Sequence, residues 1–138
     1  MRRLITGVRD GRSCIVEEVD YHPDEAKLGG SEFTSFPVGP GAPRPPGRGA
    51  WLDLHTPAGH LRWSTVRFAP NGGYTQMHHT DTIDCHTILS GSIDLILDDG
   101  PHRLTAGDHL VVTGVDHAWH AGPEGCTTSL IIIGTPPP

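Results

Sequence analysis

The stretch Gly72–Gly91, GGYTQMHHTDTIDCHTILSG, is the part of this sequence that decides its fold. It places three histidines and two aspartates within a segment that has the pattern of two β-strands joined by a turn. A second stretch, Gly107–His120, GDHLVVTGVDHAWH, again combines histidine and aspartate with short apolar runs. Imidazole and carboxylate groups gathered in this way are typical of transition-metal sites.

Length and composition favour a single all-β domain. The chain has 138 residues, enough for a hydrophobic core, and its 18 glycines and 13 prolines disfavour long helices. The formal net charge is −6 and no cluster of lysine and arginine occurs, so no nucleic-acid partner is expected. No apolar run is long enough to cross a membrane, and no signal peptide is recognised at the start. Cys14, Cys85 and Cys126 lack paired spacing, so we expect reduced thiols in a cytoplasmic protein.

Two regions are expected within this one domain. Residues 1–50 are predicted to form an N-terminal β-hairpin, closed by the turn Asp10-Gly11, and a Pro/Gly-rich loop at Gly39–Gly49 that packs on the rest of the chain. Residues 51–138 are predicted to form a β-barrel, because short strands follow one another without helical periodicity. The expected strands are Leu4–Val8, Ser13–Val19, Trp51–His55, His60–Phe68, Thr75–His79, His86–Leu89, Ser92–Leu97, His102–Thr105, His109–Thr113, His117–His120 and Thr127–Ile133.

Alternation along these strands sorts the polar side chains into an inner and an outer face. The first His-rich segment is expected to turn at residues 81–83, so that the side chains on both sides of the turn share the inner face. The side chains expected to point inward are those of Gln76, His78, Thr80, Asp84, His86, His117 and Trp119. The same alternation points His79, Cys85 and His120 outward.

The spacing of glycines and histidines resembles that of a known family. The pattern Gly72-x5-His78-x-Thr80-x3-Asp84-x6-Gly91 is similar to the first motif of the cupins. The pattern Gly107-Asp108-x4-Thr113-Gly114-x2-His117 is similar to a short form of their second motif. The resemblance covers roughly residues 61–134. It implies an all-β, double-stranded β-helix (the cupin jelly-roll barrel), here with an N-terminal hairpin, that binds one divalent metal ion and forms a homodimer.

The resemblance also implies a metal site, with two departures from the family pattern. Cupins usually hold the metal with two histidines and a glutamate from the first motif and one histidine from the second. His78 and His117 match that pattern, whereas Thr80 stands in place of a histidine and Asp84 in place of the glutamate. His86 is either a further ligand or a general acid or base. The predicted metal ligands are His78, Asp84, His86 and His117, around one divalent transition metal ion (Zn, Fe, Mn or Ni).

A purely structural interpretation of the same residues also stays open. The two family-matching histidines can be buried imidazoles that are hydrogen-bonded to their neighbours, and Asp84 can serve only to cap a turn. His86 can simply line the barrel.

The function implied by the resemblance is chemistry on a small molecule. The phrase His-x-Thr-Asp-Thr-Ile-Asp at residues 78–84 resembles a subgroup of small single-domain cupins, some of which accompany polyketide or aromatic-compound pathways. We expect a metal-dependent enzyme that cyclises, dehydrates or isomerises a small aromatic or polyketide-like molecule, with His86 as catalytic residue. The residues expected to line the substrate pocket are Tyr74, Gln76, Thr80 and Trp119. Two alternatives are an Fe(II)-dependent dioxygenase and a non-catalytic small-molecule-binding cupin, which would tolerate Thr80.

Overall fold

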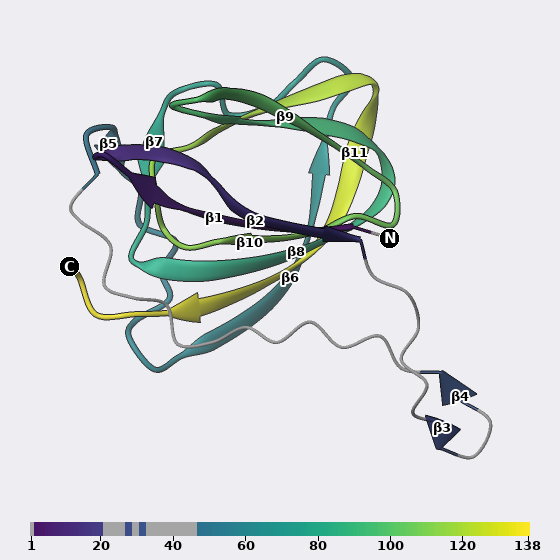
Figure 1. Ribbon diagram of the computed structural model, residues 1–138, viewed down its shortest axis with the longest axis horizontal. Coiled ribbons are helices and arrows are strands. Elements are labelled where there is room, and N and C mark those ends of the chain that lie inside the picture. Colours follow the sequence, from purple (N-terminus) through teal and green to yellow (C-terminus); the bar gives the residue numbers. More distant parts are fainter. Residues whose placement is uncertain (1, 21–26, 29–30, 33–46) are drawn as a thin grey trace.

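The computed structural model describes residues 2–20, 27–28, 31–32 and 47–138 (Figure 1). Most of the predicted loop Gly39–Gly49 therefore lies outside the described residues. The described residues form β-strands and no helix. The strands are β1 (Arg2–Arg9), β2 (Arg12–Asp20), β3 (Lys27–Leu28), β4 (Ser31–Glu32), β5 (Ala50–Trp51), β6 (Leu61–Phe68), β7 (His78–His79), β8 (Thr82–Leu97), β9 (Gly100–Thr105), β10 (His109–Val112) and β11 (Ala118–Gly134).

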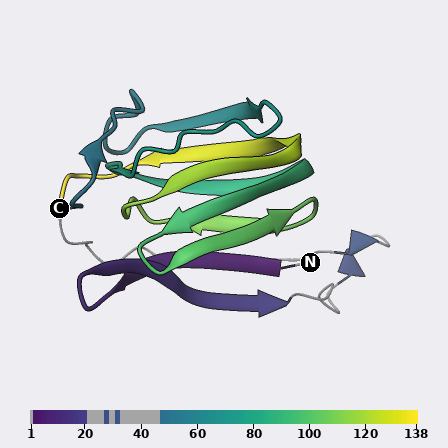
Figure 2. The same ribbon diagram turned by 90° about the horizontal axis from the view of Figure 1, so that it is seen from above.

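One seven-stranded sheet makes up most of the barrel. Its strand order is β2-β1-β10-β8-β11-β6, with β9 paired to β8. The pairing of β1 with β10 is parallel, with Arg3 opposite His109, and the other pairs in this sheet are antiparallel. Figure 2 shows the strands of this sheet curving over one another, with the β1–β2 hairpin along one side. The predicted all-β jelly-roll barrel with an N-terminal hairpin is confirmed.

The two central strands are longer than the sequence predicts. The predicted strands His86–Leu89 and Ser92–Leu97 are parts of the single 16-residue strand β8. Gly91 does not end the strand, because it takes a positive φ of 74° and lies where a Cβ would collide with the carbonyl oxygen of Gly125 on β11. The register of β8 and β11 shifts at this close approach and then resumes. The last two predicted strands likewise merge, into the 17-residue β11.

Two other predicted strands are wrong over most of their length. Of the predicted strand Trp51–His55, only Trp51 lies in a strand, β5 (Ala50–Trp51). The strand cannot continue to His55 because the chain turns there, where φ is +53°. Of the predicted strand Thr75–His79, only His78–His79 (β7) is a strand. Before it, Gly73 (φ +148°) packs against the backbone carbonyl of Trp119, which takes the chain out of strand geometry.

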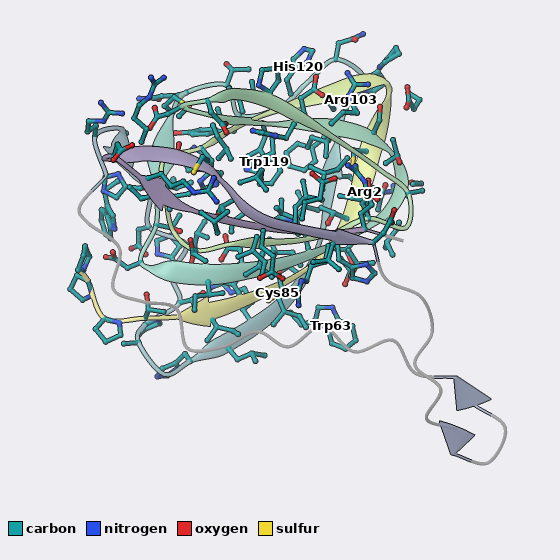
Figure 3. The ribbon with its side chains drawn as sticks, in the orientation of Figure 1. Arg2, Trp63, Cys85, Arg103, Trp119 and His120 are labelled. Atoms are coloured by element: carbon teal, nitrogen blue, oxygen red, sulfur yellow. The ribbon has the colours of Figure 1, made fainter. Side chains whose placement is uncertain are left out.

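The interior of the barrel has a polar end and an apolar end. Along β8 the side chains at alternate positions are buried, first the polar Thr82, Asp84 and His86 and later the apolar Ile93 and Leu95. Figure 3 shows Trp119 pointing into the barrel, whereas Trp63 and Cys85 lie on its outer side. The apolar cluster that stabilises the fold consists of Leu4, Ile88, Ile93, Leu95, Leu97, Leu104, Leu110, Val112, Val115, Trp119, Ala121 and Cys126.

The N-terminal hairpin forms around the predicted turn and joins the main sheet. Asp10 and Gly11 both have positive φ, as a tight hairpin turn requires. Arg2 anchors the hairpin, because its Nε and Nη2 donate to Asp108 Oδ1 (3.2 Å) and Oδ2 (2.8 Å). Although burial alone would raise the pKa of Asp108, the hydrogen bonds from Arg2 and from the Thr105 amide lower it below its ordinary value.

Candidate functional site

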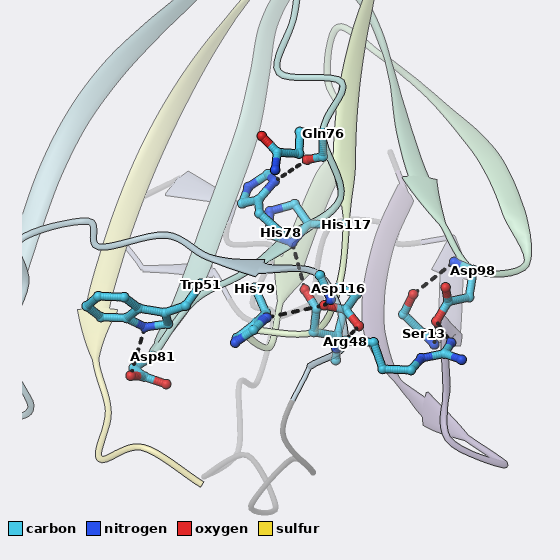
Figure 4. Close-up of polar contacts among 12 residues, drawn as sticks. Ser13, Arg48, Trp51, Gln76, His78, His79, Asp81, Asp98, Asp116 and His117 are labelled. Carbon is cyan, nitrogen blue, oxygen red and sulfur yellow. Dashed lines mark hydrogen bonds and ion pairs between the residues drawn. The ribbon is translucent and has the colours of Figure 1, made fainter.

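The two predicted ligands that are farthest apart in sequence lie side by side. His78, on β7, and His117, just before β11, form an isolated β-bridge in which each backbone N–H donates to the other residue's carbonyl, both at 2.9 Å. Their imidazole rings are 4.1 Å apart between centroids (Figure 4). Both side chains are almost fully buried. The bridge therefore creates a pair of enclosed imidazoles at the polar end of the barrel.

Backbone carbonyls determine which ring nitrogen of each imidazole carries the proton. His78 Nδ1 lies 2.9 Å from the carbonyl oxygen of Gln76, and His117 Nδ1 lies 2.7 Å from that of Val115. Because a carbonyl oxygen can only accept, each Nδ1 is the protonated nitrogen in the neutral ring. The lone pair of each ring is then on Nε2, where it can bind a proton, a donor or a metal ion.

Burial keeps both rings uncharged near neutral pH. It lowers the pKa of His78 below the ordinary histidine value. It lowers the pKa of His117 to about 3, an effect that the neighbouring charge of a protonated His78 would strengthen. The pair therefore offers two neutral Nε2 acceptors.

His86 and Asp84 occupy the same inner face of β8, as predicted, and both are buried. Burial lowers the pKa of His86 to about 4, and its ring packs 5.0 Å from that of Trp119. Burial raises the pKa of Asp84 to about 6, although a side-chain hydrogen bond with Thr82 acts to lower it. Within the described part of the chain, Asp84 Oδ1 has no hydrogen-bond partner. An acid of this pKa exchanges its proton readily near neutrality.

Two buried threonine hydroxyls complete this polar end. Thr80 points inward, as predicted, and accepts a hydrogen bond of 2.9 Å from the Thr82 hydroxyl. The turn predicted at residues 81–83 is not formed, because β8 already begins at Thr82. Thr82 was not predicted as a site residue, although the alternation that places Asp84 and His86 inward also places Thr82 on that face.

The predicted pocket-wall residues take three different positions. Trp119 is part of the core, with its ring 5.5 Å from that of His117. Tyr74 is exposed, yet its ring meets His78 edge-on at 4.7 Å. Gln76 is exposed, contrary to the expectation that it faces inward, because the chain has not yet entered β7. Its contribution to the site is the backbone carbonyl that orients His78.

A carboxylate that the sequence analysis did not single out holds the site's surroundings together. Asp116 is buried, and its two oxygens accept the backbone N–H groups of Arg48 (2.7 Å) and Gly49 (2.9 Å). The chain continues from there into β5, which pairs in parallel with β7. His79, expected at the surface, is half-buried, with its Nδ1 3.4 Å from Asp116 Oδ1. Asp116 thus fixes the strand next to His78 while it precedes His117 in the chain.

The residues predicted to bind a metal do not assemble as one set. Among the described residues, no group of three or more His, Cys, Asp or Glu side chains is placed where it could hold a metal ion. Of the predicted ligands, His78 and His117 form the pair described above, and metal binding by His78, Asp84, His86 and His117 stays a prediction. The three cysteines are free thiols.

Comparisons with known proteins give partial matches. No protein-family model matches the chain. Two proteins from Diaporthe leptostromiformis, phomopsin biosynthesis cluster proteins C′ and D, are each 47% identical to this chain over 49 residues, which is 35% of the chain. The chain spans about a quarter (26%) of the length of these relatives.

In the part of the chain that the structure describes, no helix is long and apolar enough to cross a membrane.

Solved structures that resemble this one do so with low sequence identity. A sugar phosphate isomerase of the cupin superfamily from Silicibacter pomeroyi is 17% identical, with a TM-score of 0.43 over 56% of this chain and 52% of its own. A cupin protein from Bacteroides fragilis is 17% identical, with a TM-score of 0.40 over 75% of this chain and 86% of its own. A transcriptional regulator of the HTH_3 family from Vibrio cholerae is 19% identical, with a TM-score of 0.47 over 55% of this chain and 43% of its own.

Proposed function

We propose that this chain is a cupin-type enzyme of secondary metabolism that binds a small molecule at the polar end of its barrel and moves a proton on it. The observation that carries the proposal is the His78–His117 pair. Two buried imidazoles lie 4.1 Å apart between ring centroids, with both Nδ1 atoms committed to backbone carbonyls, so the Nε2 atom of each neutral ring is the one that can accept a proton. A neutral imidazole whose surroundings exclude water can accept a proton from a bound molecule.

The other buried groups fit the same chemistry. Asp84 can return or accept a proton, since it is buried and only partly hydrogen-bonded among the described residues. Thr80 and Thr82 can hold a substrate oxygen through their hydroxyls. Cyclisation, dehydration and isomerisation all proceed by moving protons between carbon and oxygen. The identity to phomopsin cluster proteins over 49 residues supports a place in secondary metabolism.

A reporter of proton abstraction tests the proposal without knowledge of the natural substrate. In 5-nitrobenzisoxazole a base removes the proton on C3, the N–O bond breaks, and a coloured cyanophenolate forms. We expect the protein to accelerate this reaction, and His78→Gln and His117→Gln each to lower the rate at least about tenfold. His102 is a half-buried histidine on β9, outside the site. His102→Gln is therefore the matched control and should leave the rate of this reaction unchanged. Equal rates for the protein, all three variants and buffer would favour the non-catalytic binding role instead.

A metal-binding role is the second candidate, and the tautomers of the pair favour it. Metal-ligating histidines commonly donate the second ring N–H to a carbonyl, as His78 and His117 do. Titration with Co²⁺, followed by its visible absorption, measures this directly. Saturable binding that is abolished by His78→Gln and also by His117→Gln would support a metal centre that has these two residues as ligands. Binding that survives both substitutions would exclude them as ligands.

A further inference from the structure

Two adjacent rows of apolar side chains cross the outer side of the main sheet. The register aligns one residue from each of β6, β11 and β8 in each row: Trp63, Ile131 and Cys85 in one, Leu61, Ile133 and Ile83 in the other. We call these six residues the apolar face. Because successive residues of a strand point to opposite sides, the apolar face lies on the side opposite to Asp84 and His86. Figure 3 shows Trp63 and Cys85 on this outer side.

Much of the apolar face is uncovered in the single chain. Trp63 is 75% exposed and Leu61 is 67% exposed, and the other four residues are half-buried. Since a large aromatic side chain has an accessible area of roughly 150 to 250 Å², the six residues together expose roughly 450 Å². The largest apolar patch on a typical monomer is of this size, roughly 300 to 600 Å², and is often functional. An interface of roughly 800 Å² per partner is a little over half apolar, so this face supplies the apolar area that such an interface needs.

The surroundings of the apolar face carry little charge. Over residues 61–68, 83–89 and 127–133, all of which the structure describes, Arg67 is the one charged side chain that alternation places on this outer side. The row next to Trp63 consists of the polar and uncharged Thr65, Ser129 and Thr87. A surface of this kind can be laid on a copy of itself without opposing like charges, as a two-fold contact requires.

The two ends of the apolar face also differ in height. On β6, Trp63 and Leu61 protrude, and the Trp63 Nε1–H donates to Ser129 Oγ at 2.8 Å, which holds the indole in one orientation. On β8, Cys85 and Ile83 are half-buried and therefore lower. A two-fold axis through the middle strand, β11, places the raised end of each copy on the low end of the other. The face is therefore complementary to itself in shape as well as in charge.

We propose that the apolar face is the contact between two copies of this chain, related by a two-fold axis at β11. In this dimer Trp63 packs on Ile83 of the second copy, and Leu61 packs on Cys85 of the second copy. The homodimer that the cupin resemblance implies thereby acquires a definite surface. The contact lies outside the barrel and does not depend on the proton transfer proposed above.

Sedimentation velocity over a dilution series tests the dimer and its anchor. We expect a monomer–dimer equilibrium with a dissociation constant of about 10 μM or lower. Trp63→Ala should raise this constant at least about thirtyfold, as loss of a central tryptophan does in other interfaces. Trp51→Ala is the matched control and should leave the constant unchanged. Trp51 is also exposed (57%) and also hydrogen-bonded through Nε1, to Asp81 at 3.1 Å, but it lies on β5, outside the apolar face.

A cross-link tests the two-fold arrangement with the contact intact. Leu61→Cys places a thiol opposite Cys85 of the second copy, and a methylene-bridged bis-methanethiosulfonate should join the two into a covalent dimer. Within one copy these positions are separated by β11, roughly 10 Å apart or more, so the short reagent does not link them. Thr65→Cys, on the same strand but outside the two rows, should give no such dimer. The double variant Leu61→Cys with Cys85→Ser should lose it.

Three results would overturn the proposal. The first is a chain that stays monomeric at about 100 μM, tenfold above the expected constant, which would assign the apolar face to a different protein partner. The second is an equal effect of Trp63→Ala and Trp51→Ala on the dimer. The third is the absence of a Cys85-dependent covalent dimer from Leu61→Cys. None of these results bears on the reaction at His78 and His117, whose buried side chains the variants do not touch.

Discussion

Replacement of Asp84 by asparagine should make the protein more stable at neutral pH. Asp84 is buried among the polar residues of β8, and one of its oxygens has no partner within the described residues. An ionised carboxylate is poorly accommodated there, because the interior solvates charge far less well than water does. Asparagine has nearly the same shape and cannot ionise, so it removes this penalty.

The size and pH range of the effect follow from the pKa of Asp84. Burial raises that pKa from 3.8 to about 6. A difference of about two pH units, at about 1.4 kcal/mol for each, corresponds to about 3 kcal/mol. Between pH 4 and pH 6 the unfolded chain has lost the proton and the folded chain still holds it, so the wild-type protein loses stability as the pH rises. The advantage of Asp84→Asn therefore grows by about 3 kcal/mol across this window and is constant above it.

Urea unfolding at pH 4, 5, 6, 7 and 8 measures this difference. The buried histidines are present in both proteins, so their contributions cancel in the comparison. Asp10→Asn is the control, because Asp10 is exposed at a hairpin turn with positive φ, which asparagine tolerates. Its difference from wild type shows what an Asp-to-Asn change at an exposed position does to the same measurement. The reasoning is refuted if the difference for Asp84→Asn is the same at pH 4 and pH 7, or if it shifts toward the wild type as the pH rises.

Three further predictions concern stability. Gly91→Ala should destabilise the fold by about 3 kcal/mol or more in urea, since it adds a Cβ at positive φ against the backbone of β11, whereas Gly11→Ala, at a similar φ with open space around it, should cost about 1 kcal/mol. Arg2→Met should lower the free energy of unfolding by about 2 kcal/mol at pH 7, because it leaves Asp108 without its guanidinium partner. The loss should be smaller at pH 3, because the pKa of Asp108 is lowered and the stabilisation disappears as the pH falls through it. Equal losses at both pH values would contradict the pairing. Because burial lowers the pKa of His86 to about 4, the wild-type protein should lose about 3 kcal/mol of folding stability through this residue between pH 6.5 and pH 4. His86→Leu should not show this loss, and thermal melting across that pH range would detect the difference.

Local sequence signals predicted the fold correctly where the conformation depends on neighbouring residues alone. Asp-Gly at positions 10 and 11 predicted the first hairpin, and both residues have the positive φ that such a turn needs. Alternation on β8 correctly placed Asp84 and His86 on the inner face. Gly91 misled the strand assignment, because a glycine that permits close approach of β11 looks in the sequence like a glycine that ends a strand.

The parts of the site that the sequence could not predict depend on distant contacts. Asp116 carries no local signal of its role, since its partners are the amides of Arg48 and Gly49, far away in the chain. Gln76 was expected to point inward, but β7 begins only two residues later. The apolar face also escaped prediction, because its rows come from strands that only the folded sheet brings together.

The parallel pairing of β1 with β10 has a consequence for how this chain reaches its native state. Arg2 and Asp108 are 106 positions apart, and β1 also pairs with residues 109–111. Segments so distant must be brought together before their contacts give any stabilisation, which makes folding slow compared with that of proteins built from local contacts. During synthesis β1 is made before its partner β10, and most of the described residues lie between them in the chain. β1 can thus pair with β2 early but gains its second neighbour only late, and until then one edge of the N-terminal hairpin remains open to other chains.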